Sequence, residues 1–177
     1  RTTIGDHFHP RGDINYPMFD MIKKIYGRLQ KLEPWIDAAR PVTDIAVIAP
    51  EHSFTLSSEK SFKLQEALKG ITRMLCELKY QFDIVDNTQD FSKYKLVILP
   101  DHVTLKGDLL EKVKNYVKSG GAVISSGKSG LDENGKDFAL KEWGVKYKGD
   151  SPHDPAYMTL ADKALATGFP EMPVTLY

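Results

Sequence analysis

Between residues 43 and 130 the chain alternates short, mainly apolar runs with longer amphipathic stretches, and this alternation limits the possible folds more than any other feature. The apolar runs are rich in β-branched residues, which is typical of strands buried on both faces. In the amphipathic stretches, apolar residues recur at the three- and four-residue spacing of a helix. The order is strand, helix, strand, strand, helix, strand, over residues 44–50, 57–79, 82–86, 94–101, 105–121 and 122–126. It predicts an α/β fold in which a parallel sheet has helices packed on both faces.

An amphipathic helix is also predicted near the N-terminus, over residues 15–36. Asn15 is suited to cap this helix, and Pro17 is suited to its first turn. Pro34 and the Arg40-Pro41 pair mark its end. The residues that follow, 37–42, are therefore expected to form a linker.

The pattern is weaker on the C-terminal side of residue 130. Residues 138–148 indicate a short helix followed by an edge strand, and residues 156–162 indicate one more strand.

The charge balance and the single cysteine exclude some classes of function. Lysine and arginine total 24, and aspartate and glutamate also total 24, so the formal net charge is zero. This balance gives no broad electrostatic attraction to nucleic acid or to an anionic membrane. No apolar run approaches the roughly 20 residues of a membrane span. Cys76 is the only cysteine, which favours a reducing compartment such as the cytoplasm. Its place in a predicted helix indicates a core residue.

The triplet Gly127-Lys128-Ser129 has the ending of a phosphate-binding P-loop. A complete loop needs another glycine five residues before Gly127, and Ala122 stands there. A P-loop also needs a helix that starts at its lysine, and the residues after Lys128 resemble a loop. The triplet is therefore interpreted as a polar turn after a strand, and no cofactor is expected.

Polar residues gather where the predicted strands end, and ligands of open α/β sheets bind outside the carboxyl ends of the strands. A nucleophilic serine there needs a histidine and an acid nearby, and the sequence shows no such pattern, so no catalytic residue is assigned. The cleft that these residues would rim is interpreted as vestigial, and helix capping is favoured over catalysis. Its residues are Glu51, Asp101, His102, Ser125 and Ser126.

The stretches LVILPD and SGGAVISS, with a helix between them, resemble class I glutamine amidotransferase-like domains. Active members carry a cysteine at the elbow after the second strand. This chain has Ser125, Ser126 and Gly127 there, so the amidotransferase chemistry does not carry over. Within that superfamily, PVTDIAVIAP, YKLVILPDHVTL, VKNYVKSGGAVISSGKSGLDENG and DPAYMTLADKALATGFPEMP resemble the trimerisation domain of family 42 glycoside hydrolases, the β-galactosidase type. The resemblance implies a Rossmann/flavodoxin-like sheet and self-association, with a trimer as the implied state.

The N-terminal stretch IGDHFHPRGDINYPMFDMIKKIYGRLQKLEPWI resembles the end of a (β/α)8 catalytic barrel in glycoside hydrolases linked to this module. The resemblance implies that residues 1–36 are the C-terminal tail of a barrel and that residues 37–42 are a linker. Residues 43–177 would then be the amidotransferase-like domain, whose C-terminal boundary the sequence leaves open. A whole barrel needs about 250 residues, so this chain would be a fragment of a larger glycosidase.

The densest polar group of the sequence is Asp6, His7, His9 and Arg11. In a barrel, active-site groups lie on the loops after the strands, and this segment would be such a loop. The four side chains are therefore candidates for contacts to sugar hydroxyls in the parent barrel, with a hydrogen-bonded structural loop as the alternative. Two histidines without a third ligand do not predict a metal site.

The resulting prediction is a non-catalytic assembly domain of a glycoside hydrolase that acts on carbohydrate. Two alternatives stay open. The first is a small standalone hydrolase that uses Ser125 or Ser126, and the second is a carbohydrate- or nucleotide-binding α/β module that uses the cleft near those serines.

Overall fold

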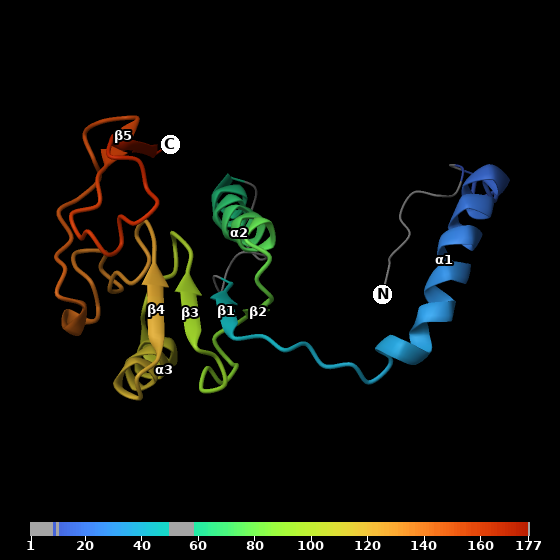
Figure 1. Cartoon of the computed structure of the whole chain (residues 1–177), viewed down its shortest axis with the longest axis horizontal. Coiled ribbons are helices and arrows are strands. Elements are labelled where there is room, and N and C mark those ends of the chain that lie inside the picture. The colour runs from blue at the N-terminus through green and yellow to red at the C-terminus, as the bar shows by residue number, and fades with distance from the viewer. Residues whose placement is uncertain (1–8, 10, 50–58, 177) are drawn as a thin grey trace. The chain divides into compact units, whose positions relative to one another are not determined.

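The computed structural model of this chain describes residue 9, residues 11–49 and residues 59–176. The chain divides into two compact units, residues 1–42 and residues 43–177. Figure 1 shows the helices and strands of both units. None of the helices within the described residues is both long enough and apolar enough to cross a membrane.

In its described part, the first unit contains one helix, α1, Tyr16–Ile36. Asn15 caps this helix as predicted, because its side-chain oxygen accepts a hydrogen bond from the Met18 N–H at 3.4 Å. Pro34 does not stop the helix, which continues for two more residues to Ile36 and has Asp37 as its C-cap. No residue of α1 is buried, so the described residues of this unit supply no core against which its apolar side chains pack.

The second unit is built on a four-stranded sheet, whose order is β2-β1-β3-β4. All three neighbouring pairs are parallel, so the predicted α/β class is confirmed. The strands are β1 (Ile45–Ile48), β2 (Phe82–Val85), β3 (Leu96–Leu99) and β4 (Ala122–Ser125), and the helices are α2 (Glu59–Glu77) and α3 (Gly107–Lys118).

The two faces of the sheet carry separate apolar cores, because successive residues of a strand point to opposite faces. On one face, Val47 and Ile98 pack with Leu75 of α2. On the other face, Ala46 packs in a larger cluster that includes Val113 of α3. The sheet therefore has a helix on each face, as predicted.

Helix α2 ends in a Schellman motif, in which the Tyr80 N–H donates to the Leu75 carbonyl at 2.9 Å and the Lys79 N–H donates to the Cys76 carbonyl at 3.0 Å. Leu75 is buried, whereas Cys76 is exposed. The prediction that Cys76 lies in the core is wrong, because neighbouring residues point about 100° apart around a helix and the core takes Leu75.

The C-terminal part of the second unit differs from the prediction in two respects. A single 3-10 turn, Lys141–Trp143, stands where the short helix was expected. The edge strand predicted after it does not form, because the Tyr147 N–H donates to the Asp137 carboxylate at 3.0 Å and not to a neighbouring strand. The predicted strand at 156–162 is present as β5, Ala156–Met158, and it pairs in antiparallel fashion with β6, Val174–Leu176.

Candidate functional site

The carboxyl ends of β3 and β4 lie side by side, and they bring three of the predicted cleft residues together. Leu99 is the register partner of Ser125. The Ser126 hydroxyl donates to Asp101 Oδ1 at 2.6 Å and accepts from the Asp101 N–H at 3.2 Å. Glu51, another of the predicted cleft residues, lies outside the described residues.

The segment after β4 is a turn held against the end of β3. The Lys128 N–H donates to the Asp101 carbonyl at 2.8 Å, and the Ser125 hydroxyl donates to the Ser129 carbonyl at 2.6 Å. The buried Ser129 hydroxyl accepts from the Val103 N–H at 2.8 Å. Turns and not a helix follow Lys128. The Gly-Lys-Ser triplet here connects the segment after β4 to the segment after β3 by hydrogen bonds.

Within the described residues, the geometry around Ser125 and Ser126 shows no partner that would activate a serine nucleophile. The Ser125 hydroxyl donates to the Ser129 carbonyl, and the Ser126 hydroxyl donates to Asp101 Oδ1. His102 is exposed, and within the described residues no imidazole hydrogen-bonds to either serine. A serine nucleophile needs such a base. The described residues also include no group of three His, Cys, Asp or Glu side chains that could hold a metal ion. The arrangement supports a structural role for Asp101, Ser125 and Ser126.

The N-terminal polar group is described only in part. Asp6 and His7 lie outside the described residues, whereas His9 and Arg11 are exposed. The His9 N–H donates to the Asp13 carbonyl at 3.0 Å, and the Gly12 N–H donates to the His9 carbonyl at 2.7 Å. These bonds form a tight turn just before α1, which leaves the side chains of His9 and Arg11 exposed.

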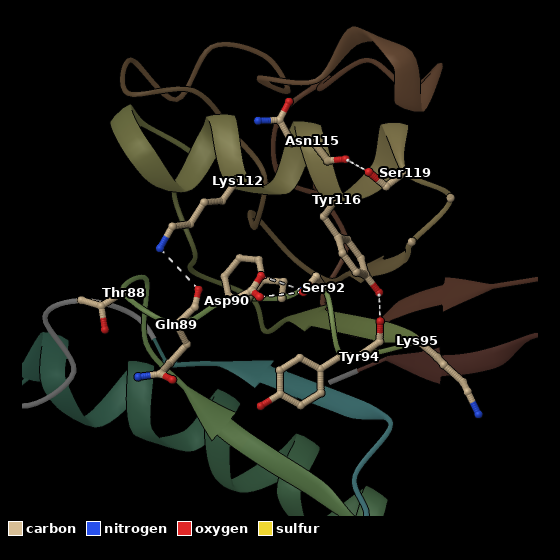
Figure 2. A pocket seen from close by; sticks show the side chains of 13 residues that line it. Thr88, Gln89, Asp90, Ser92, Tyr94, Lys95, Lys112, Asn115, Tyr116 and Ser119 are labelled. Carbon is tan, nitrogen blue, oxygen red and sulfur yellow. Dashed lines mark hydrogen bonds between the residues drawn. The ribbon is translucent and has the colours of Figure 1, made fainter.

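A cleft of about 660 Å³ lies at the opposite ends of the strands, where β3 and β4 begin. Figure 2 shows its lining residues, which come from the loop between β2 and β3, from α3 and from the turn before β4. Tyr94 and Tyr116 form part of its floor, and the Tyr116 hydroxyl donates to the Tyr94 carbonyl at 3.1 Å. The sequence analysis did not predict this cleft, because it expected ligand sites only at the carboxyl ends of the strands. The aromatic residues just before β3 and β4 were the feature of the sequence that could have indicated it.

Tyr94 also hydrogen-bonds to a carboxylate on β2, that of Asp83. The Tyr94 hydroxyl donates to Asp83 Oδ2 at 2.7 Å, and the Thr43 hydroxyl donates to the same atom at 2.8 Å. These hydrogen bonds, with a smaller contribution from Lys93, lower the pKa of Asp83. Burial in turn raises the pKa of the Tyr94 phenol. Asp83 therefore stays ionised and fixes Tyr94.

Three comparisons relate the chain to known proteins. It is 24% identical over 119 residues to the β-galactosidase GanA of Bacillus subtilis (strain 168), a match that covers 64% of this chain and 18% of GanA. The structure of α-L-fucosidase isoenzyme 2 from Paenibacillus thiaminolyticus superposes with a TM-score of 0.71 and 29% identity, over 96% of this chain and 26% of that enzyme. Gan42B, a GH42 β-galactosidase from G. stearothermophilus, shares the fold with a TM-score of 0.55 and 18% identity, over 92% of this chain and 25% of that enzyme.

The chain thus spans about a quarter or less of the length of these relatives. The family model of the β-galactosidase trimerisation domain matches residues 50–144, a range that includes β2, β3, β4, α2 and α3. This range is more than half of the chain. The sheet, the two helices that flank it and this match place the chain in the β-galactosidase trimerisation domain family.

Proposed function

We propose that this chain is a non-catalytic assembly segment of a larger glycoside hydrolase. The observation that carries the proposal is the family match, because it assigns residues 50–144 to a trimerisation domain. The fucosidase likeness supports the same view, since nearly all of this chain corresponds to about a quarter of that enzyme. The remaining length of such a relative leaves room for a catalytic barrel of about 250 residues.

We infer further that residues 1–36 are the tail of that barrel and that residues 37–42 link it to the assembly domain. Ile25, Leu29 and Leu32 of α1 recur at helical spacing, yet each is 36–49% exposed. An amphipathic helix normally buries such a stripe against a core. In the parent protein, the rest of the barrel would supply this core. Asp6, His7, His9 and Arg11 would then lie on a barrel loop, within reach of a sugar.

The parent enzyme would hydrolyse a glycoside, and the relatives indicate more than one candidate sugar. One is named a β-galactosidase and another an α-L-fucosidase. The geometry at the strand ends supports an assembly role for residues 43–177, because Ser125 and Ser126 are committed to hydrogen bonds with neighbouring segments. A standalone hydrolase would need one of these hydroxyls to be free.

The coding sequence upstream of the Arg1 codon gives the first test. An open frame that encodes a barrel-sized repeat of strands and helices is expected. The whole gene product should hydrolyse nitrophenyl galactosides or fucosides and should sediment as an oligomer, and removal of residues 43–177 should give a monomer. The 177-residue chain alone should be inactive. A start codon next to Arg1, a monomeric whole protein or hydrolysis by the isolated chain would each overturn the proposal.

A further inference from the structure

Strand β4 stands at the edge of the four-stranded sheet, and its outer side pairs with no other strand of the described residues. Figure 1 shows it as the last strand of the row, next to β3. The N–H groups of Ala122 and Ser126 donate to carbonyl groups of the β3 segment, at 3.3 and 3.2 Å. Successive N–H groups of a strand point to alternate sides, so those of Val123 and Ser125 face away from β3. Among the described residues, none accepts a hydrogen bond from these two N–H groups.

The sequence of β4 does not protect this edge from a further strand. Native proteins usually guard an edge strand with a lysine, a proline or a bulge. Strand β4 reads Ala-Val-Ile-Ser, without a charged residue or a proline, and its four residues pair one to one with those of β3, so it has no bulge. All of them except Val123 are exposed. The edge can therefore accept one more strand through backbone hydrogen bonds.

An apolar hollow of about 440 Å³ lies against this edge. None of the residues that line it is charged, and they are Val123, Ser125, Gly127, Phe138, Trp143 and Val145. The rings of Phe138 and Trp143 form one wall, with their centroids 6.0 Å apart, and Val145 is 51% exposed. Alternate side chains of a strand point to the same face of a sheet. A strand added beside β4 would therefore direct every second side chain toward the hollow, where apolar residues fit.

The order of the strands indicates the same position. Doubly wound sheets of the flavodoxin type have the order 2-1-3-4-5, and this sheet holds the first four places, β2-β1-β3-β4. The next strand of this chain, β5, does not take the fifth place, because it pairs with β6 in a separate sheet. The chain corresponds to only 26% of the fucosidase whose structure it matches, so a parent protein of that length has further segments that could take this place.

We propose that β4 pairs in the parent protein with one further parallel strand, which the same polypeptide supplies from outside residues 1–177. The outward backbone groups of Val123 and Ser125 bond to this strand, and its apolar side chains fill the hollow. The added strand lies in the plane of the sheet, so it leaves open the face that carries Ile124. The inference rests on the proposed function only in that the chain belongs to a larger protein, and it does not depend on self-association.

Hydrogen–deuterium exchange of the whole gene product and of the 177-residue chain tests the proposal, with single amides resolved by electron-transfer fragmentation. In the 177-residue chain, the Val123 and Ser125 amides should exchange fast, because no described residue accepts their hydrogen bonds. In the whole gene product, both amides should exchange about tenfold more slowly or slower still. This protection should be the same at every protein concentration, because the strand belongs to the same polypeptide.

A charge in the hollow should weaken the pairing. Val145→Asp places a carboxylate where the added strand would have to bury it. In the whole gene product, this variant should exchange its Val123 and Ser125 amides about tenfold faster than the parent protein does. Asn134→Asp adds the same charge in an exposed turn, so it is the matched control and should leave both rates unchanged. Rates in Val145→Asp as slow as in the parent protein would show that no strand fills the hollow.

Three other results would overturn the proposal. The first is equally fast exchange of the two amides in both proteins, because the edge would then stay open. The second is slow exchange already in the 177-residue chain, because a segment of this chain would then cover the edge. The third is protection that disappears on dilution, because a second copy would then supply the strand. A monomeric gene product with protected amides would contradict the assembly role and support this inference.

Discussion

Glycine is required at position 121 because an aromatic ring occupies the space where a side chain would be. A Cβ atom built on Gly121 would lie 2.3 Å from the Tyr116 ring, closer than real contacts allow, and Tyr116 is fixed by its hydrogen bond to Tyr94. Gly121→Ala should therefore lower the free energy of unfolding by about 1–3 kcal/mol. Chemical denaturation monitored by circular dichroism measures this change.

Gly70 is the matched control, since it lies in α2, has a helical backbone and has nothing within 4 Å of the place that a Cβ atom would take. Gly70→Ala should raise the stability by about 0.5–1 kcal/mol. Equal effects of the two substitutions would show that the ring of Tyr116 does not occupy the space beside Gly121.

Asp83 makes the stability of the second unit sensitive to acid. Its pKa is lowered chiefly by hydrogen bonds from Tyr94 and Thr43, so the ionised form is favoured in the folded state. The ordinary pKa of this carboxyl group is 3.8, and its stabilisation of the fold is complete above that pH. The stabilisation is lost as the pH falls from 3.8 toward the lower pKa of the folded state. At pH 7, Asp83→Asn should lower the free energy of unfolding by about 1 kcal/mol. Below pH 4, the stability of this variant should fall less steeply with pH than that of the parent chain.

Urea denaturation at several pH values tests this prediction. Glu133→Gln, which removes an exposed carboxylate from a turn, is the control and should keep the steep decline. Asp86 and Asp90 also have lowered pKa values, owing to hydrogen bonds from Thr88 and Ser92, so part of the decline should persist in Asp83→Asn. An unchanged pH profile in Asp83→Asn would mean that the Tyr94 hydrogen bond does not stabilise the fold.

At the level of the elements, the sequence predicted the sheet well because its two central strands, β1 and β3, are continuous apolar runs. Such a run can be recognised from the local sequence alone, without knowing which distant residues pack against it. The segment around Tyr147 was predicted wrongly because its backbone N–H bonds to Asp137, a choice that depends on how the chain turns at Gly144. Strand β6 was not anticipated, since its three residues are ordered by pairing with β5. The cleft lined by Phe91 and Tyr116 was not predicted, because ligand sites were expected only at the carboxyl ends of the strands.

Helix α1 should be less protected from hydrogen exchange than the sheet. It buries none of its residues, and in proteins most of the stability of a helix comes from the packing of its apolar face. Its amides should therefore exchange faster, by orders of magnitude, than those of Val47 and Ile98, which lie in the core. Hydrogen–deuterium exchange of the 177-residue chain measures this difference. Protection of α1 equal to that of β3 would show that this chain already supplies a partner for the helix.

In the second unit, helix α2 covers only the middle of one face of the sheet. Ile84, Val47, Ile98 and Ile124 are register partners in a row across the four strands. A helix about 10 Å wide covers about two strands that lie about 4.8 Å apart. Accordingly, Val47 and Ile98 are 0% and 4% exposed below α2, whereas Ile84 and Ile124 at the two edges are 51% and 52% exposed.

These open edges are where we expect an assembly domain to bury further apolar surface. Charged residues there should disrupt self-association without unfolding the unit, because neither side chain belongs to a core cluster. In the whole gene product, Ile124→Lys should raise the dissociation constant of the oligomer about tenfold or more, as measured by sedimentation velocity over a concentration series. Asn134→Lys adds the same charge in an exposed turn and should leave assembly intact. If Ile84→Lys and Ile124→Lys both assemble as the parent protein does, the self-association surface lies away from this face of the sheet.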